Sequence, residues 1–363
     1  MNAISLFDME AIAKQVMPFN KWEFVDAGAA DEITVRRNRT AFEDITVNPR
    51  FLVDVGDRDL STEVLGEKID FPVMIAPAGS QRDVHPDGER ATAAGAGAMG
   101  TLYTLPTGSG YSIEEVADVA TGPLWFQLYH FDDEVTEILV TRAKAAGYKA
   151  VVLTIDTPTP SPKERDLRNA HARTPGLYWG SLRDQMELVE RREVGIPDMA
   201  DWTPPGYTGL TWDRLDWLRD LTGLPLVVKG IRTIEDAVSC AEYGVDGIVV
   251  SNHGGRQLDG TRASIETLPE IADAVGDRLE VYLDSGVRRG LDVLKAIALG
   301  AKGVFVGRPL FWGLANGGQS GVEHMLEILR AEFDRALAYT GCRSVSEIHR
   351  GLVSLNSDFR TRV

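Results

Sequence analysis

The stretch PLVVKGIRTIEDAVSCAEYGVDGIVVSN (225–252) decides the fold class of this 363-residue chain. Its two apolar runs, PLVVKG (225–230) and GIVVSN (247–252), flank TIEDAVSCAEYG (233–244), in which apolar residues recur at helical spacing. Continuously apolar runs are typical of strands buried on both faces, and the segment between them is typical of an amphipathic helix. The stretch therefore predicts a strand–helix–strand unit of a parallel sheet.

Apolar runs of this kind recur eight times along the chain. They are FPVMIAPA (71–78), TLYTL (101–105), LWFQLY (124–129), AVVLTID (150–156), PLVVKG (225–230), GIVVSN (247–252), EVYLDSG (280–286) and GVFVG (303–307). Amphipathic segments separate them, at residues 89–100, 112–120, 133–147, 211–223, 233–244, 263–276 and 289–300. Eight alternating units predict an α/β protein of the (β/α)8 TIM-barrel class, and an open doubly wound sheet is the alternative.

Three segments extend this predicted barrel, which we place at residues 71–340 of a single domain spanning 1–363. Residues 1–70 are expected to cap the N-terminal side of the barrel, and residues 341–363 form a C-terminal segment. The insertion 157–224 is far longer than one helix and is rich in proline, glycine and charge. Because it follows the fourth strand at the C-terminal face, where barrel active sites lie, we predict a lid loop.

The charge balance restricts the partners of the protein. Its 38 lysines and arginines against 54 acidic residues give a net charge of −16, which disfavours nucleic acid and anionic membranes as partners. We see no apolar run long enough to span a membrane and no signal peptide. Cys240 and Cys342 show no paired spacing, so we expect neither a disulfide nor a zinc site, and a cytoplasmic location.

Polar residues follow the predicted strands at the end where barrel active sites lie. They are Gln127, Tyr129, Thr154, Asp156, Lys229, Ser251, His253, Asp284 and Arg308. Because five of the eight strands carry ionisable groups at this end, we expect these side chains to converge on one pocket. The turns LDSGVRRG (283–290) and VGRPL (306–310) add glycines, Arg288 and Arg308, and such turns after strands 7 and 8 predict a phosphate site.

The segment SNHGGRQLDG (251–260) is the densest in reactive residues. His253 has the chemistry of a base near neutral pH. Asp156 has the chemistry of a carboxylate that holds the His253 ring and stabilises its imidazolium form. Arg256 suits bidentate binding of a carboxylate. An ordinary loop histidine is the alternative interpretation. The six histidines are scattered along the chain without ligand spacing, so we predict no metal site.

The same segment resembles the active-site signature of the FMN-dependent α-hydroxy acid oxidases and dehydrogenases, the family of glycolate oxidase, lactate oxidase, mandelate dehydrogenase and hydroxymandelate oxidase. Other stretches share the family pattern: DAGAADEITVRRNRTAFEDI (26–45), MIAPAGSQRDVHPDGE (74–89), FQLY (126–129), TIDTP (154–158), VVKG (227–230), LDSGVRRG (283–290) and VGRP (306–309). The resemblance covers nearly the whole chain. It implies an enzyme that uses FMN to oxidise a 2-hydroxy acid to the 2-oxo acid.

The resemblance also implies a role for each matching residue. His253 takes the hydroxyl-side proton, Asp156 orients it, and Tyr129 and Arg256 bind the substrate. Electrons pass to flavin N5, and the pattern leaves a hydride route and a carbanion route open. The flavin ring and ribityl chain are expected against Ala76, Pro77, Ala78, Gly79, Gln127, Thr154, Lys229, Ser251 and Asp284. The phosphate is expected at Gly286, Arg288, Gly307 and Arg308.

The chain departs from the family pattern around the substrate. Phe24 stands where a tyrosine usually helps to bind the substrate carboxylate, and Lys163 stands where a second carboxylate-binding arginine is usual. Arg165 takes that place if the loop shifts by two residues. Gly108 occupies the position of a bulky tryptophan in glycolate oxidase.

Two positions near the flavin differ as well: Pro106 replaces a residue that commonly carries a hydroxyl, and Ser285 replaces the first glycine of the usual LDGG. Together the departures predict a 2-hydroxy acid substrate bulkier than glycolate or lactate. Oxidation of a non-carboxylate alcohol or amine is one alternative, and a flavin-binding barrel without turnover is another. The electron acceptor, oxygen or another molecule, stays open, and the family predicts a homotetramer or an octamer.

Overall fold

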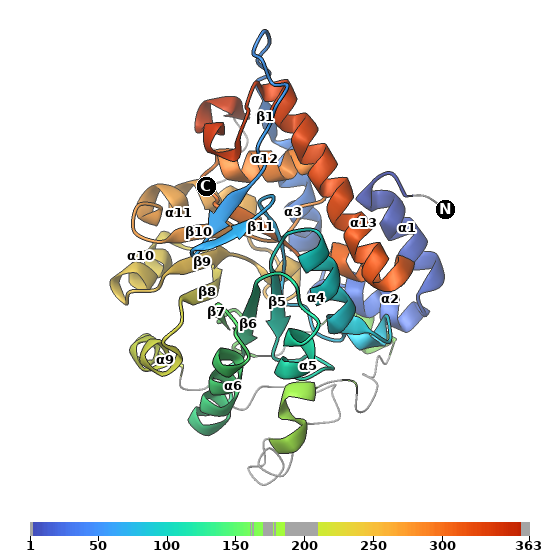
Figure 1. Ribbon diagram of the computed structural model, residues 1–363, viewed down its shortest axis with the longest axis vertical. Helices are drawn as coiled ribbons and strands as arrows, with labels where there is room; N and C mark the ends of the chain where they lie inside the picture. The colour runs from blue at the N-terminus through green and yellow to red at the C-terminus, as the bar shows by residue number, and fades with distance from the viewer. Residues whose placement is uncertain are drawn as a thin grey trace.

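The computed structural model describes residues 3–159, 161, 163–169, 177, 179–185 and 210–356. Within them, eight parallel strands close into a barrel in the order β10-β11-β4-β5-β6-β7-β8-β9, with helices around the outside (Figure 1). The strands coincide with the eight apolar runs: β4 (Val73–Ile75), β5 (Tyr103–Pro106), β6 (Leu124–Leu128), β7 (Ala150–Thr154), β8 (Leu226–Ile231), β9 (Gly247–Val250), β10 (Glu280–Leu283) and β11 (Gly303–Val306). The predicted (β/α)8 barrel is confirmed.

Each amphipathic segment forms a helix that precedes the next strand. The helices are α4 (Gly88–Ala98), α5 (Ile113–Ala117), α6 (Asp133–Ala145), α9 (Arg214–Thr222), α10 (Ile234–Glu242), α11 (Ser264–Val275) and α12 (Gly290–Ala298). Side chains of Ser112, Asp132 and Thr233 cap α5, α6 and α10 by accepting from backbone amides of the first turn. After β11, the long helix α13 (Arg308–Thr340) runs beside α1 (Leu6–Val16) and α4 (Figure 1).

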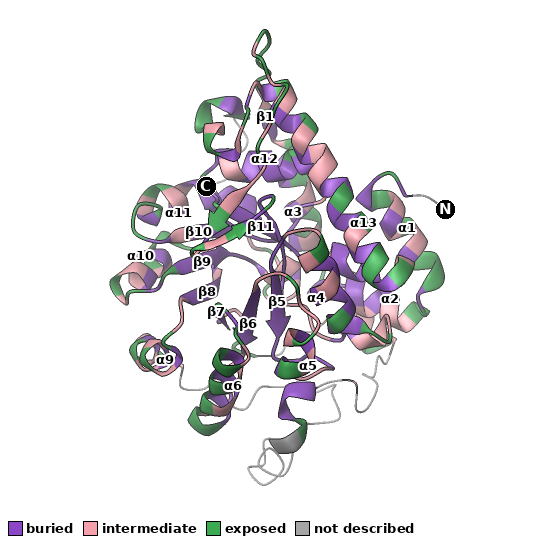
Figure 2. Ribbon diagram, in the orientation of Figure 1, coloured by how far each residue is buried: buried purple, intermediate pink, exposed green. Residues whose placement is uncertain are grey.

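Each barrel strand is buried on both faces, because it packs inward against other strands and outward against helices. Inside, Trp125, Tyr282 and Phe305 form an aromatic cluster with ring centroids 5.6, 5.8 and 6.0 Å apart. Outside, alternate residues such as Phe126 and Leu153 belong to the core beneath the helices. Figure 2 shows the strands buried and the outer helix faces exposed. The continuous apolar runs of the sequence have this physical origin.

The N-terminal segment reaches both ends of the barrel, so the prediction that it caps the N-terminal side holds for one part only. That part is the hairpin of β2 (Thr62–Val64) and β3 (Glu67–Ile69). The amide of Leu65 at its turn donates to the carboxylate of Glu280, which begins β10, at 3.2 Å. Side chains of the hairpin pack with the barrel interior.

Helices α2 (Phe19–Asp26) and α3 (Ile33–Glu43) lie instead against the loops at the C-terminal end of the barrel. Asn38 of α3 exchanges two side-chain hydrogen bonds, of 2.9 and 2.7 Å, with Asn252 after β9. The carboxylate of Asp259 accepts from the first backbone amides of α3. For these helices the prediction was wrong, because polar contacts to a distant loop decide where they pack.

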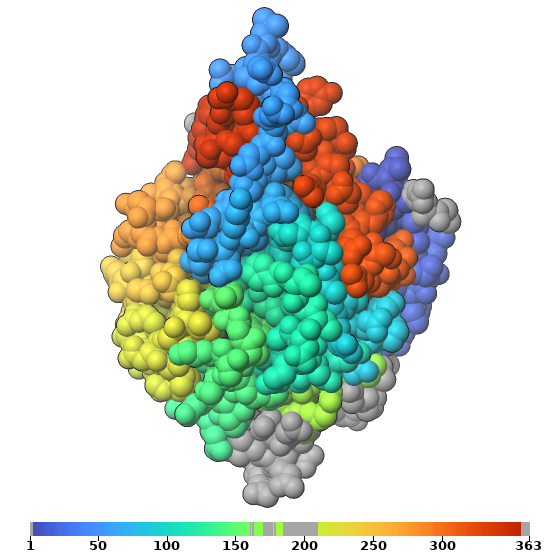
Figure 3. Space-filling model, viewed as in Figure 1, coloured from blue at the N-terminus to red at the C-terminus, as the bar shows by residue number. Residues whose placement is uncertain are grey.

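The C-terminal segment returns to the N-terminal one. Strand β12 (Val353–Leu355) pairs antiparallel with β1 (Ile45–Val47). The segment 48–61 that follows β1, light blue in Figure 3, projects at one end of the molecule. Backbone bonds tie it to the end of α13 and the residues beyond, since the amide of Arg50 donates to the carbonyl of Tyr339 at 3.1 Å.

Much of the predicted lid, 157–224, lies outside the described residues. The described parts include α7 (Glu164–Arg168), the 3-10 helix Gly180–Gln185 and α9. No helix in the described ranges is long and apolar enough to cross a membrane.

We expect Asn38→Ala to lower the free energy of unfolding by about 1–3 kcal/mol, because it removes both side-chain hydrogen bonds between Asn38 and the buried Asn252 and leaves the Asn252 amide only its 3.3 Å bond to the Arg262 carbonyl. Urea unfolding of the purified protein measures the loss. Asn48→Ala is the matched control, since Asn48 is exposed beside β12 and its loss is expected to cost at most about 0.5 kcal/mol. Equal losses in the two variants would contradict an anchoring role for Asn38.

Candidate active site

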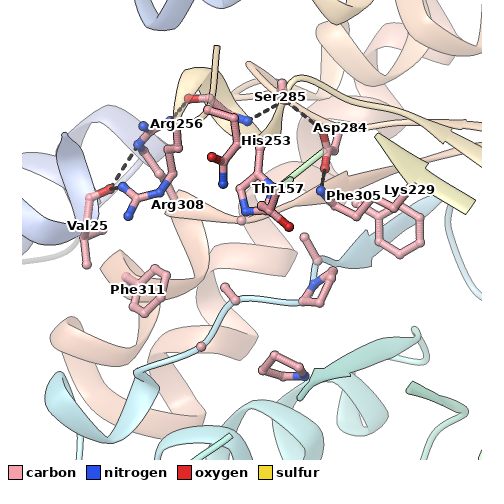
Figure 4. A pocket seen from close by; sticks show the side chains of 18 of the residues that line it. Val25, Thr157, Lys229, His253, Arg256, Asp284, Ser285, Phe305, Arg308 and Phe311 are labelled. Carbon is pink, nitrogen blue, oxygen red and sulfur yellow. Dashed lines mark hydrogen bonds and ion pairs between the residues drawn. The ribbon is translucent and has the colours of Figure 1, made fainter. Parts of the chain in front are cut away.

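A cavity of about 500 Å³ lies at the C-terminal ends of the barrel strands. Parallel closure brings the loops that follow the strands onto one face, so residues far apart in sequence share its wall. Most of the predicted site residues line it: Phe24, Ala76, Pro77, Ala78, Gly79, Gly108, Gln127, Tyr129, Lys163, Lys229, His253, Arg256, Asp284, Gly286, Arg288, Gly307 and Arg308. Figure 4 shows part of this wall, with His253 between the arginines and the Lys229–Asp284 pair.

His253 and Asp156 form an ion-pair geometry beside the cavity. Nδ1 of His253 lies 2.8 Å from Oδ1 of Asp156. Burial lowers the pKa of His253, an effect that Asp156 opposes and Lys229 reinforces. Burial also disfavours ionisation of Asp156, but the interactions of its carboxylate with His253 and with the charge of Lys229 outweigh burial and hold the pKa of this carboxyl below its usual value. A neutral imidazole beside an ionised carboxylate is the arrangement of a general base.

A second pair, Lys229 and Asp284, is almost fully buried. The ammonium nitrogen of Lys229 lies 3.3 Å from Oδ2 of Asp284 and donates to the hydroxyl of Ser251 at 3.1 Å. Burial disfavours the charge of Lys229, but Asp284 and then Asp156 outweigh it and raise the pKa of the amine. The cavity wall therefore carries a fixed positive charge, which suits stabilisation of negative charge on a bound group.

Thr107 supports the neighbouring part of the wall and was not among the predicted residues. Its backbone amide donates to Oε1 of Gln127 at 3.1 Å, and its hydroxyl donates to the Gln127 carbonyl at 2.6 Å. The same hydroxyl accepts from the backbone amide of Tyr129 at 3.0 Å. Gln127 in turn donates to the hydroxyl of Thr154 at 3.1 Å. A hydroxyl residue just after the second barrel strand was the only local signal for it.

Arg256, in the loop after β9, and Arg308, the first residue of α13, both reach the C-terminal end of α2. Nη1 of Arg256 donates to the carbonyls of Phe24 and Ala27, both at 2.8 Å, and its guanidinium lies 5.2 Å from the Phe24 ring centroid. Arg308 donates to the carbonyls of Ala27 at 3.1 Å and Gly254 at 2.9 Å. Because helix C-termini favour cations, these contacts hold α2 and its Phe24 at the cavity wall.

Arg288 and Arg308 concentrate positive charge where the sequence predicts a phosphate. In the part of the chain that the structure describes, no ion pair joins either guanidinium to a carboxylate. Burial, followed by the charges of Arg308 and Arg39, lowers the pKa of Arg288 to about 9, and burial also lowers the pKa of Arg308. Among the described residues, a Cβ at Gly307 would meet only Ala76, at 3.9 Å. The guanidinium groups of Arg288 and Arg308 repel each other, and a bound phosphate offsets this repulsion. The residues present therefore fit the phosphate of FMN.

Lys163 and Arg165 differ in what surrounds them. Lys163 lines the cavity, and its ammonium donates to the carbonyl of Ser161 at 3.4 Å. Arg165 is not among the lining residues, because it forms a bidentate pair with Glu23 at 2.7 and 2.6 Å. It also contacts Asp26 and Glu32, at 2.8 and 3.2 Å. These ion pairs tie α7 to α2 and to the turn before α3.

Four predicted residues stand behind the cavity wall: Asp156, Thr154, Ser251 and Arg165. The first three support it through His253, Gln127 and Lys229. Further residues line the cavity without having been predicted: Val25, Thr157, Thr159, Ser161, Asp166, Leu167, Gly254, Gln257, Val287, Phe305, Val306 and Phe311. Most adjoin a predicted motif. Those from 157 to 167 lie at the start of the insertion, where we predicted no helix or strand and where the structure forms α7 (Glu164–Arg168).

Comparison with known proteins agrees with this geometry. The sequence model of a family described as FMN-dependent dehydrogenase matches residues 13–355. The L-lactate oxidase of Nostoc sp. is 45% identical over 358 residues, which are 97% of this chain and 98% of that protein. The glycolate oxidase of Spinacia oleracea is 42% identical over 360 residues, 99% of this chain and 97% of that protein.

A solved structure of mandelate oxidase with benzoyl-formic acid is also similar. It is 40% identical, covers 98% of this chain and 99% of its own, and has a TM-score of 0.88. The chain is therefore a member of the FMN-dependent α-hydroxy acid oxidase and dehydrogenase family, an oxidoreductase that uses FMN to oxidise the CH–OH group of a 2-hydroxy acid.

Proposed function

We propose that this enzyme oxidises a 2-hydroxy acid bulkier than glycolate or lactate to its 2-oxo acid, with His253 as the base. The observation that carries the base assignment is the 2.8 Å contact between His253 and Asp156 at the cavity wall. When bound, FMN supplies the acceptor for the two electrons that leave the substrate. The chain supplies the base, the positive charge that binds the carboxylate, and the walls that exclude water.

The side chains around His253 have different roles, which follow from their chemistry. Arg256 and Lys163 bring positive charge to the cavity and bind the substrate carboxylate, and Tyr129 supplies a phenol that hydrogen-bonds the substrate. His253 accepts the hydroxyl-side proton. Asp156 orients the ring and stabilises the imidazolium that forms, because its carboxylate remains ionised beside it.

The lining residues favour a bulky substrate. Gly108 contributes no side chain, while Phe24, Leu167 and Phe311 add apolar surface. An aromatic or long-chain group on the substrate gains by burial against such surface. The mandelate oxidase structure similar to this chain has benzoyl-formic acid, an aromatic 2-oxo acid, as its named ligand, which supports the same size class here.

We base the compartment, the oligomeric state and the electron acceptor of this enzyme on its sequence and on the family resemblance. Cys240 and Cys342 are both buried and free, which suits the reducing cytosol that we infer for this enzyme. We further infer an assembly of four or eight copies, as the resemblance implies. Oxygen or another small acceptor reoxidises the enzyme, and admitting air to the substrate-reduced protein distinguishes the two.

We expect anaerobic addition of mandelate, 4-hydroxymandelate or a long-chain 2-hydroxy acid to bleach the flavin band faster than glycolate or lactate does. His253→Gln should slow this reduction by about 10²–10⁴-fold, because the base is lost. His130→Gln is the matched control, since His130 is buried but is not a lining residue. Flavin that dithionite reduces and no 2-hydroxy acid does would redirect the search to uncharged alcohols and amines.

Asp156→Asn should move the protonation midpoint of His253 to lower pH, because it removes the negative charge that stabilises the imidazolium. NMR of protein labelled with ¹⁵N-histidine measures the midpoint, and His253→Gln assigns the signal. Asp133→Asn is the matched control. It changes the carboxylate that lies 3.4 Å from Nε2 of His130 and does not change the partner of His253. An unmoved His253 midpoint in Asp156→Asn would refute the coupling of the two groups.

Lys163→Met should raise KM for the 2-hydroxy acid by about 10- to 100-fold, because a charge-assisted bond to the carboxylate is lost. Lys163→Arg should retain binding. Arg165→Met is the matched control: it breaks the ion pairs to Glu23, Asp26 and Glu32, so we expect a lower Tm and a smaller change in KM. A larger rise in KM for Arg165→Met than for Lys163→Met would instead assign binding of the substrate carboxylate to Arg165.

A further inference from the structure

Ser285 has a backbone conformation that side chains rarely adopt. Its φ of 75° lies in the left-handed region that favours glycine, the residue usual at this position of the family pattern. The serine hydroxyl is engaged on both sides (Figure 4). It donates to Oδ1 of Asp284 at 2.7 Å and accepts from the backbone amide of Gly254 at 2.9 Å. A residue with a strained backbone, whose side chain both donates and accepts a hydrogen bond, is typical of a functional site.

The hydroxyl closes a ring of polar contacts around the active-site turn. From Ser285 the contacts run to Asp284, then to Lys229 at 3.3 Å, and then to the hydroxyl of Ser251 at 3.1 Å. That hydroxyl accepts from the backbone amide of His253 at 3.0 Å. The ring therefore begins and ends on adjacent residues of the same turn, His253 and Gly254.

The turn itself needs such support. His253, Gly254 and Gly255 have φ values of 57°, 67° and 73°, three successive residues in the left-handed region. Asn252 accepts from the amide of Gly255 at 3.0 Å, and Ser251 accepts from the amide of His253. The amide between them, that of Gly254, is held only by Ser285 among the described residues. Without the hydroxyl, the Gly254 amide has no partner among the described residues, and the middle of the turn keeps only the bond that the Gly254 carbonyl accepts from Arg308, at 2.9 Å.

We propose that Ser285 is a positioning residue, which fixes the His253 turn against the Lys229–Asp284 pair so that the base and the buried ammonium keep a constant separation. The inference rests on the proposed role of His253. A glycine at this position adopts the backbone conformation more easily but has no hydroxyl, and an alanine has neither advantage. Compared with a glycine, the serine of this chain gains a hydroxyl that forms hydrogen bonds and loses backbone freedom.

Two variants separate the hydroxyl from the backbone. Ser285→Ala removes the hydroxyl and keeps the Cβ, and Ser285→Gly removes both. Ser80→Ala is the matched control, because Ser80 is also a buried serine in the left-handed region, at φ 66°, and its hydroxyl has no hydrogen-bond partner among the described residues. All three are compared with the wild type as FMN-loaded proteins.

The first measurement is hydrogen exchange of the Gly254 amide, read from fragments that cover 251–257. We expect both Ser285 variants to exchange there about two- to tenfold faster, with no change over α6 or in Ser80→Ala. The second is stopped-flow reduction of the flavin. In both variants its limiting rate should fall by about two- to tenfold or more, with the dissociation constant of the substrate preserved.

Wild-type exchange and wild-type reduction in both Ser285 variants would overturn the proposal. So would a slow Ser285→Ala beside a normal Ser285→Gly, because the backbone and not the hydroxyl would then control the turn. If no 2-hydroxy acid reduces the wild type, the proposed function fails, while the exchange at Gly254 still tests the role of Ser285. The two failures are therefore distinguishable.

Discussion

The pairing of β11 with β4 is the contact on which the active site depends, because it closes the sheet into a barrel. In an open sheet these strands would lie on opposite edges, and the turn Gly307–Arg308 would lie far from residues 76–79. Closure brings both onto the wall of one cavity. The aromatic cluster of Trp125, Tyr282 and Phe305 fills the barrel beneath, so the cavity has a packed floor rather than an open channel.

Charge is arranged differently in two parts of this wall. Where the base lies, each ionised group has a partner: the Asp156 carboxylate has the His253 imidazole, and Lys229 has Asp284. Where the phosphate is expected, the described residues offer Arg288 and Arg308 no carboxylate partner. Paired buried charges hold side chains in place, whereas two neighbouring, partly buried cations without a carboxylate partner favour an anionic ligand. On a protein with a net charge of −16, such a local excess of cations is specific to its ligand.

Local patterns located the barrel strands because burial on both faces leaves a continuously apolar run, and they located the residues that follow those strands. They did not place α2 and α3. The partner of Asn38 is Asn252, 214 residues away, and the partners of the α2 carbonyls are Arg256 and Arg308. Contacts at such separations leave no periodic signal. Residues 1–70 were therefore assigned to the N-terminal end of the barrel, although α2 and α3 pack at the other end.

The amino-acid sequence was sufficient to predict the barrel, through its apolar periodicity, and the candidate base, through the residues at strand ends. It predicted the flavin cofactor through its resemblance to a known family. Which cation of the insertion lines the cavity, Lys163 or Arg165, depended instead on three-dimensional packing. Lys163 and Arg165 are two residues apart at the start of α7, and side chains at that spacing point to different sides of a helix. The carboxylates of Glu23, Asp26 and Glu32 meet one of those sides and hold Arg165 there. That choice depends on which surfaces meet in space, and no local pattern of residues encodes it.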